Sequence, residues 1–195
     1  MSETVHTSSW TRTEYDCLIA SGFFHEDEAI ELVGGQLIVA EPKGTDHSVA
    51  IELAAEALRQ AFGAGWTVRV QDPRSGSSRP RQESEPEPDL AVVPGSPRDY
   101  LIAHPSRPAL VLEVAESSLS FDRRDKGRLY ARAGVEDYWI VNLVDRVLEV
   151  YREPAPSAET PHGWSYRQVQ RLGPEANVSP LAAPAASIPI ADLLP

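Results

Sequence analysis

Short apolar runs separated by glycine, proline and polar residues fill most of the chain, and their spacing distinguishes strands from helices. Runs of about four to eight residues that alternate, or that are continuously apolar, predict strands. These runs are residues 29–33, 36–40, 66–71, 89–93, 109–114, 138–142, 146–151 and 164–169. The first two runs flank Gly34 and Gly35, which predicts a hairpin with a glycine turn.

Three segments carry helix signals instead. Thr11 and Glu14 have the spacing of a capping box, which predicts the start of a short helix. Asp46 is expected to cap a second helix over residues 47–62, where apolar residues recur at helical spacing. A third helix is expected over residues 122–133, between two of the predicted strands.

Two segments have no apolar periodicity. Residues 73–87 are rich in Pro, Ser, Arg and Glu, which predicts a long loop. The tail from Pro174 is rich in Pro and Ala and is expected to be weakly structured, with residues 188–194 docking on the body. Hairpins combined with a strand, helix and strand succession predict an α/β (α+β) protein, in which helices flank a mixed β-sheet.

The composition narrows the class of protein. A chain of 195 residues is expected to form one domain with its own core. A single cysteine, Cys17, excludes an internal disulfide and a cysteine-based zinc cluster. Because no apolar run approaches the roughly 20 residues of a membrane span and no signal peptide is evident, a cytoplasmic protein without a membrane partner is expected. The preference for Arg, Ala and Pro is typical of a GC-rich bacterial coding sequence.

The net charge of −11 argues against a broad nucleic-acid-binding surface, because neutralising phosphates requires clustered Lys and Arg. It excludes neither a local basic patch nor an acidic site that attracts phosphate once cations are bound. Arg124, Arg128 and Arg132 recur at every fourth position and could form such a patch. A stripe of this kind is more often a solvated helix face.

Two acidic residues stand in or beside the predicted core strands. Side chains alternate across a strand, so Asp89 shares a face with Ala91, and Glu113 shares a face with Ala115. If these strands are neighbours, the two carboxylates converge and repel each other unless a cation lies between them. Mg²⁺ (or Mn²⁺) suits such a site because it prefers oxygen ligands, and the carbonyl of Val114 could supply a further one.

Lys126 is one of two lysines in a chain that has sixteen arginines. Lysine can lose or share its proton when partly buried, whereas arginine does not, so a proton-handling or water-positioning amine must be a lysine. Lys126 precedes Leu129 and Tyr130 by three and four residues, which places it on the apolar face of the predicted helix. It could reach a water beside Glu113, or it could simply cover the edge of the sheet.

These residues belong to a longer ordered set of motifs. In order they are Glu31-Leu32 before the glycine turn, His47, Glu87-Pro88-Asp89, Leu112-Glu113-Val114, Phe121-Asp122-Arg123, Lys126, Tyr130, Gly134-Val135 and the run from Asp137 to Asn142. The set resembles the Uma family of putative restriction endonucleases, within the PD-(D/E)XK nuclease superfamily, over roughly residues 8–152. The resemblance implies a restriction-endonuclease-like fold and a divalent-metal site that hydrolyses DNA. It implies a nuclease-like core over residues 1–152, with residues 153–195 adding an edge strand and tail to the same domain.

By position in these motifs, the resemblance implies that Asp89 and Glu113 are catalytic residues that bind the metal. It makes Glu31 a helper acid, although a carboxylate in a hairpin is commonly solvated. The superfamily pattern places a lysine two residues after the Glu, and that position is Ala115 here. Alanine cannot position water, so the resemblance requires Lys126 to reach the site from the helix.

Further residues are candidate substrate contacts: His47, Gln71, Arg124 and Arg128. Ala115 and the acidic net charge leave open a second interpretation, in which an inactive nuclease fold binds nucleic acid or a protein partner. A third interpretation is a metal hydrolase that acts on a small phosphate ester. The oligomeric state is open, although a homodimer would suit the cleavage of both DNA strands.

Overall fold

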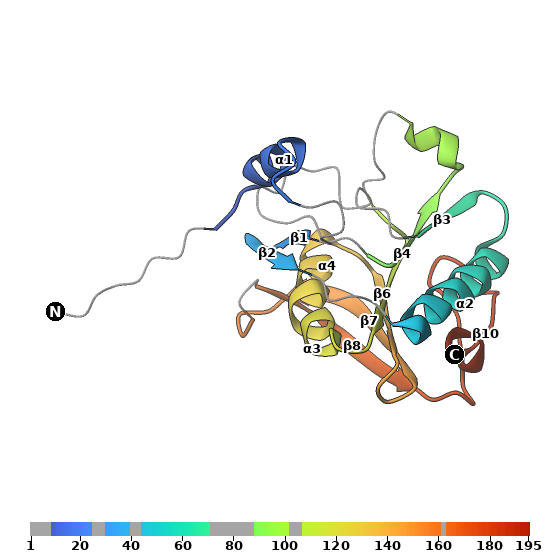
Figure 1. Ribbon diagram of the computed structural model, residues 1–195. Helices are drawn as coiled ribbons and strands as arrows, with labels where there is room; N and C mark the ends of the chain where they lie inside the picture. Colours follow the sequence, from blue (N-terminus) through green and yellow to red (C-terminus); the bar gives the residue numbers. More distant parts are fainter. Residues whose placement is uncertain (1–8, 25–29, 40–43, 71–87, 102–106, 161–162) are drawn as a thin grey trace.

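Figure 1 shows the computed structural model, which describes residues 9–24, 30–39, 44–70, 88–101, 107–160 and 163–195. Within these residues the longer strands form one six-stranded sheet in the order β3-β4-β5-β6-β7-β8. The strands are β3 (Trp66–Val70), β4 (Leu90–Pro94), β5 (Leu110–Ala115), β6 (Asp137–Asn142), β7 (Val147–Pro156) and β8 (Trp164–Leu172). Strands β5 and β6 are parallel and the other neighbouring pairs are antiparallel, which confirms the predicted mixed sheet.

The parallel strands β5 and β6 are joined by a helical crossover. It consists of α3 (Leu119–Phe121), the π-helical turn η2 (Asp122–Lys126) and α4 (Gly127–Ala133), so it begins three residues before the predicted start. A Cβ atom on Gly127 would lie 3.1 Å from the Asp122 carbonyl oxygen and 3.3 Å from the ring of Tyr138. Glycine at this position therefore lets the crossover pack closely against β6.

Helices cover both faces of the sheet, with α2 (Thr45–Phe62) on one side and α3 and α4 on the other (Figure 1). In β5, Leu112 and Val114 pack in the cluster that contains α2, whereas Val111 and Ala115 pack in the cluster that contains α4. Because side chains alternate across a strand, Glu113 lies on the α4 face. No helix in the described ranges has the combination of length and apolar composition required to cross a bilayer.

A small N-terminal unit lies beside the crossover helix (Figure 1). It contains α1 (Arg12–Ala20) and the hairpin of β1 (Ile30–Val33) and β2 (Gln36–Val39). The predicted capping box of Thr11 and Glu14 is present at the start of α1. The Tyr15 hydroxyl donates a hydrogen bond of 2.8 Å to the carbonyl oxygen of Ile30, which ties α1 to the strand that carries Glu31.

Some element boundaries differ from the prediction. Gly44 is the N-cap of α2, so the prediction that Asp46 caps this helix is wrong. Asp46 lies in the first turn, where the helix dipole favours a negative charge. The short 3₁₀ helix η1 (Pro97–Tyr100) was not predicted, and β7 and β8 extend beyond their predicted ends. Residue 71 and the loop predicted over 73–87 lie outside the described residues.

The C-terminal tail is more ordered than its composition predicted. It forms β9 (Asn177–Val178), β10 (Ile188–Pro189) and the 3₁₀ helix η3 (Ile190–Leu193). Ile190 and Leu193 are fully buried in the cluster around α2, in agreement with the predicted docking of residues 188–194. The buried Asp137 carboxylate accepts hydrogen bonds from Arg152 at 2.8 Å and from the Leu181 backbone N–H at 2.8 Å, so it also ties the tail to the sheet.

Candidate active site

Adjacent strands bring Asp89 and Glu113 together. β4 and β5 are antiparallel neighbours in which Leu90 faces Leu112, and this register sets Asp89 beside Glu113. The Asp89 backbone N–H donates to Glu113 Oε2 at 3.3 Å, and the Val114 N–H donates to Asp89 Oδ2 at 2.8 Å. Both acids are almost completely buried, with 4% of Asp89 and 2% of Glu113 exposed.

Lys126 enters the same place from the crossover helix. Its Nζ atom lies 3.3 Å from Glu113 Oε1 and 3.1 Å from Glu31 Oε2. The amine therefore links an acid of the main sheet to an acid of the N-terminal hairpin. Only 6% of Lys126 is exposed, so the side chain points into the protein and does not extend along the sheet edge into solvent.

Two further residues, which were not among the candidate site residues, also reach this cluster. The Tyr130 hydroxyl donates to Glu113 Oε1 at 2.7 Å. Asp122 is 2% exposed and accepts a hydrogen bond of 2.6 Å from the Ser118 hydroxyl. Both lie four residues from Lys126, and this spacing was the available sequence signal because it places them on the same side of a helix.

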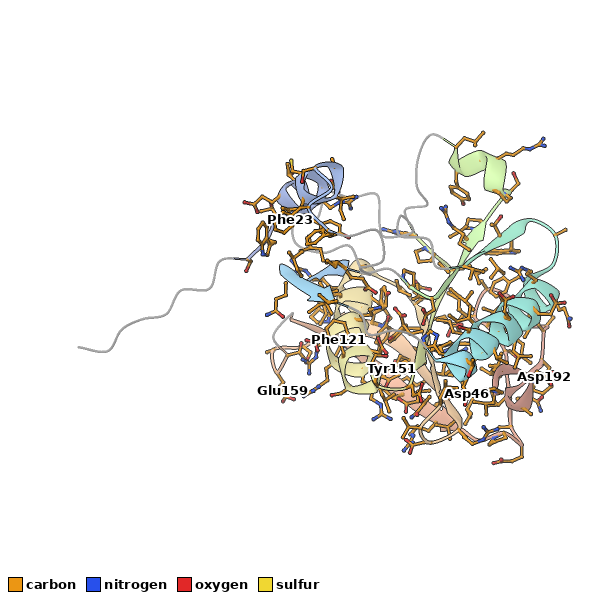
Figure 2. All side chains as sticks on the ribbon, in the orientation of Figure 1. Phe23, Asp46, Phe121, Tyr151, Glu159 and Asp192 are labelled. Atoms are coloured by element: carbon orange, nitrogen blue, oxygen red, sulfur yellow. The ribbon has the colours of Figure 1, made fainter. Side chains whose placement is uncertain are left out.

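A pocket of about 400 Å³ opens at this cluster. Its lining includes the acids and amine described above together with Ile38, Val39, Gly44, His47, Val114, Glu116, Ser117, Ser118 and Phe121. Figure 2 labels Phe121, a lining residue on the crossover, and Asp46 at the start of α2, the helix that contributes His47 to the lining. Residues of both helical layers and of the hairpin therefore line the pocket.

His47 lies in the first turns of α2 and faces the acids. Its Nε2 atom is 3.5 Å from Asp89 Oδ2, and 7% of the residue is exposed. Among the described residues, His47 Nδ1 has no hydrogen-bond partner. The structure thus brings this candidate substrate contact to the pocket itself.

The predicted arginine contacts are arranged differently. Arg124 is exposed, and its guanidinium donates to the backbone oxygen and hydroxyl of Ser120 on its own helix. Arg128 is half-buried. Neither residue lines the pocket, and the fourth candidate contact, Gln71, lies outside the described residues.

Burial and mutual repulsion perturb the acids of the pocket. Burial raises the pKa of Glu113 well above its ordinary value, Lys126 opposes this rise, and Asp89, Asp122 and Glu31 reinforce it. Burial likewise raises the pKa of Asp122 to about 6, again against the effect of Lys126. The pKa of Lys126 is lowered by burial but raised more strongly by the surrounding carboxylates, so the net shift is upward. The amine is therefore an ammonium ion at neutral pH.

The cluster carries more negative than positive charge. Four carboxylates surround one ammonium, so ionisation of all of them would leave a buried negative excess that a divalent cation could offset. No three His, Cys, Asp or Glu side chains among the described residues form a ready metal cage. Mg²⁺ does not require one, because it is usually bound through one or two carboxylates and retains several waters. The donor set of Asp89, Glu113 and the Val114 carbonyl fits that mode of binding.

A comparison with family models shows which family the chain belongs to. The model of the Uma2 family, described as "Putative restriction endonuclease", matches residues 12–191. The chain belongs to this family. The match extends through the C-terminal tail, beyond the residues that carry the sequence motifs. Membership of the family supports a nuclease function for the protein.

A solved structure has the same fold. It is the 1.96 Å crystal structure of a putative nuclease belonging to DUF820 from Anabaena variabilis ATCC 29413. The two chains are 17% identical with a TM-score of 0.67, and the similarity covers 94% of this chain and 96% of that chain. A comparison with curated proteins found no significant match.

The raised pKa of Asp122 has a measurable consequence for stability. The pKa is about 6 in the folded protein against 3.8 for an ordinary Asp, so the folded state holds this proton more tightly than the unfolded state. Ionisation therefore costs stability, and this cost develops as the pH rises from about 4 through 6. We expect Asp122→Asn, which keeps the group neutral, to stabilise the protein by about 2 kcal/mol at pH 8 in EDTA and by little at pH 4.

Urea unfolding of both proteins at the two pH values measures this difference. Asp125→Asn is the matched control, because it makes the same charge change in the same π-turn at a half-buried position. An equal gain in both variants would attribute the effect to net charge. A gain that does not depend on pH would contradict the assignment to Asp122 ionisation.

Proposed function

We propose that this protein is a divalent-metal-dependent endonuclease that hydrolyses phosphodiester bonds in DNA. The observation that carries the proposal is the convergence of Asp89, Glu113 and Lys126, from two strands and a helix, at one pocket. Membership of a family described as putative restriction endonucleases agrees with this chemistry. Buried acids that meet beside a lysine are costly to keep, which favours a functional over a purely structural explanation.

In this proposal Asp89 and Glu113, with the Val114 carbonyl, hold Mg²⁺ or Mn²⁺. When bound, such a cation supplies Lewis acidity toward water and toward the phosphate oxygens. Asp89 directly precedes β4 and Glu113 lies in β5. The Asp89 N–H donates to Glu113 Oε2 and the Val114 N–H donates to Asp89 Oδ2, so the separation of the two acids is fixed by the sheet. A rigid pair of carboxylates suits an ion that demands regular octahedral geometry.

Lys126 acts as a positively charged donor. Because its pKa is raised, it holds its proton at neutral pH and is poorly suited to remove one from water. It can orient a water by hydrogen bonding and offset negative charge on the phosphate in the transition state. Glu31, whose Oε2 lies 3.1 Å from Nζ, pairs with the amine and, with Glu113, favours its charged form.

DNA is the proposed substrate, and the cytoplasm is the proposed location. The acidic pocket would repel a phosphodiester until a cation is bound, so metal binding precedes substrate binding in this scheme. Arg124 and Arg128 lie on the crossover outside the pocket lining and are proposed contacts for the DNA backbone. His47 and Gln71 are proposed contacts nearer the cleaved phosphate, and a homodimer would place two such sites on one duplex.

Nicking of supercoiled plasmid tests the proposal. Purified protein is incubated with plasmid in Mg²⁺ or Mn²⁺, and matched reactions contain EDTA. We expect open-circular product with either metal and none in EDTA. A single-nucleotide phosphodiester analogue is tested in parallel, because a small-ester hydrolase would prefer it to plasmid. Absence of nicking at high protein concentration in both metals would refute the endonuclease assignment.

The second candidate function is binding without cleavage. Position 115, where the superfamily pattern places a lysine, holds Ala115, which is fully buried in an apolar cluster. Lys126 already pairs with Glu113 and Glu31. In a binding-only module the lysine would simply neutralise the acids. Metal affinity separates the candidates, because a module of this kind has no reason to bind Mn²⁺ through Asp89 and Glu113.

A further inference from the structure

The two carboxylate oxygens of Glu113 have different surroundings. Oε1 accepts a hydrogen bond from the Tyr130 hydroxyl at 2.7 Å and lies 3.3 Å from Lys126 Nζ. Oε2 contacts only one donor among the described residues, the Asp89 backbone N–H, at the longer distance of 3.3 Å. One oxygen is therefore held by the crossover helix, and the other lies on the Asp89 side with capacity for a further ligand.

We propose that Tyr130 is a positioning residue, whose hydroxyl fixes the carboxylate of Glu113 so that Oε2 is presented to the divalent cation. This inference rests on the proposed function, because it concerns the same pocket. A carboxylate can rotate about its last torsion, which is broad and weakly restrained. A short hydrogen bond to one oxygen removes that freedom and lowers the reorganisation needed when the cation binds.

The ring of Tyr130 is itself firmly held. Its centroid lies 5.0 Å from that of Tyr138, which in turn lies 5.5 Å from Tyr151 and 6.0 Å from Tyr166. This tyrosine cluster packs α4 against the sheet. Because Tyr130 follows Lys126 by four residues on the crossover, one helix face delivers both donors to Oε1. Lys126 provides a positive charge at Oε1, and the hydrogen bond from Tyr130 fixes the orientation of the carboxylate.

The test is Tyr130→Phe, which removes the hydroxyl and leaves the ring in the cluster. Binding of Mn²⁺ to the protein alone is followed by the loss of the free-ion EPR signal. We expect the Kd for Mn²⁺ to weaken by about 10- to 100-fold. The Mn²⁺ concentration needed for half-maximal plasmid nicking should rise by a similar factor, with little change in the KM for DNA.

Tyr166→Phe is the matched control. Its hydroxyl is also buried in the tyrosine cluster, but it donates to the Val135 carbonyl oxygen at 2.9 Å, whereas the Tyr130 hydroxyl donates to Glu113. Removal of a hydroxyl with a purely structural role would lower the melting temperature without changing the Kd for Mn²⁺. We therefore expect both variants to lose some thermal stability, and only Tyr130→Phe to lose metal affinity.

The outcomes separate the inference from the proposed function. Wild-type protein that binds Mn²⁺ and nicks plasmid, with Tyr130→Phe binding equally well, overturns the positioning role and leaves the nuclease intact. Equal weakening in Tyr130→Phe and Tyr166→Phe also overturns it, because the effect would then be general loosening of the cluster. Wild-type protein that neither binds Mn²⁺ nor nicks plasmid overturns both.

Discussion

Replacement of Asp89 by Asn is expected to reduce metal-dependent nicking of plasmid by about 10³-fold or more, without lowering the free energy of unfolding. Asn has nearly the same shape, and its Oδ1 can still accept the hydrogen bond that the Val114 N–H donates to Asp89 at 2.8 Å. A neutral amide is a much weaker ligand for a divalent cation than a carboxylate. Loss of about 4 kcal/mol of electrostatic stabilisation corresponds to the expected decrease. Initial nicking rates and urea unfolding measure the two quantities.

The matched control is Asp192→Asn. Asp192 is exposed on η3, at the C-terminal end of the chain and away from the pocket-lining residues (Figure 2). The Asp192→Asn variant has the same change in charge as Asp89→Asn and should nick plasmid at the wild-type rate. Because both variants pass through the same purification, a contaminating nuclease would appear equally in each. Wild-type activity in Asp89→Asn would remove this residue from the catalytic site.

The strands and their faces could be predicted because alternation is a local property of each run. Glu113 was assigned to the opposite face from Leu112 and Val114, and the two core clusters divide in that way. The pairing of β4 with β5 could only be assumed, since it depends on the whole fold. The order of the C-terminal tail is also a long-range effect. Ile190 and Leu193 become buried only because α2 offers them an apolar surface.

The start of α2 and the π-turn could not be predicted from the sequence, for a different reason. Gly44 and Asp46 are both acceptable near a helix start, and their preferences differ by too little to select one position. The π-turn at residues 122–126 has no periodicity of its own, because it inserts one wide turn between two helical segments. Its effect is nevertheless functional in this proposal, since Asp122 and Lys126 both face the pocket.

Within the candidate site, residue type alone was enough to predict a role for the acids and for Lys126, but not for Tyr130. A buried acid or a rare lysine stands out against an apolar pattern. Tyr130 fits the apolar face, so spacing alone predicts only packing. The spacing of Tyr130 from Lys126 becomes a usable signal only in combination with its hydroxyl, because a buried tyrosine normally needs a hydrogen-bond partner, and this hydroxyl donates to Glu113.

Ala115 and Lys126 can be understood together. Ala115 lies on the same strand face as Glu113 but is fully buried in the apolar cluster with Tyr130. A lysine there would have to place its stem through the packed tyrosines. The crossover helix lies over this face, so an amine from Lys126 reaches Glu113 Oε1 at 3.3 Å without disturbing the cluster. Lys126 therefore supplies an amine beside Glu113 that a lysine at position 115 could supply only by disturbing the cluster.

Lys126→Met is expected to lower the free energy of unfolding by about 3 kcal/mol at pH 8 in EDTA, because it leaves the buried Glu113 and the half-buried Glu31 without their counter-charge. Plasmid nicking should fall by about 100-fold, since the donor to water or phosphate is lost. Mn²⁺ binding should persist, because the proposed ligands are intact and a competing positive charge has gone. Urea unfolding, nicking rates and Mn²⁺ EPR measure the three effects.

A double-mutant cycle isolates the ion pair. In a Glu113→Gln background, Lys126→Met should cost about 1–2 kcal/mol less than in the wild type, because the main unpaired charge is already absent. Arg167→Met, which removes an exposed positive charge from β8, controls for net charge and should change stability by less than about 0.5 kcal/mol. Additive effects of the two site substitutions would show that Lys126 and Glu113 are not coupled. The amine would then have no electrostatic role at this acid, which would contradict the ion pair on which the expected loss of stability rests.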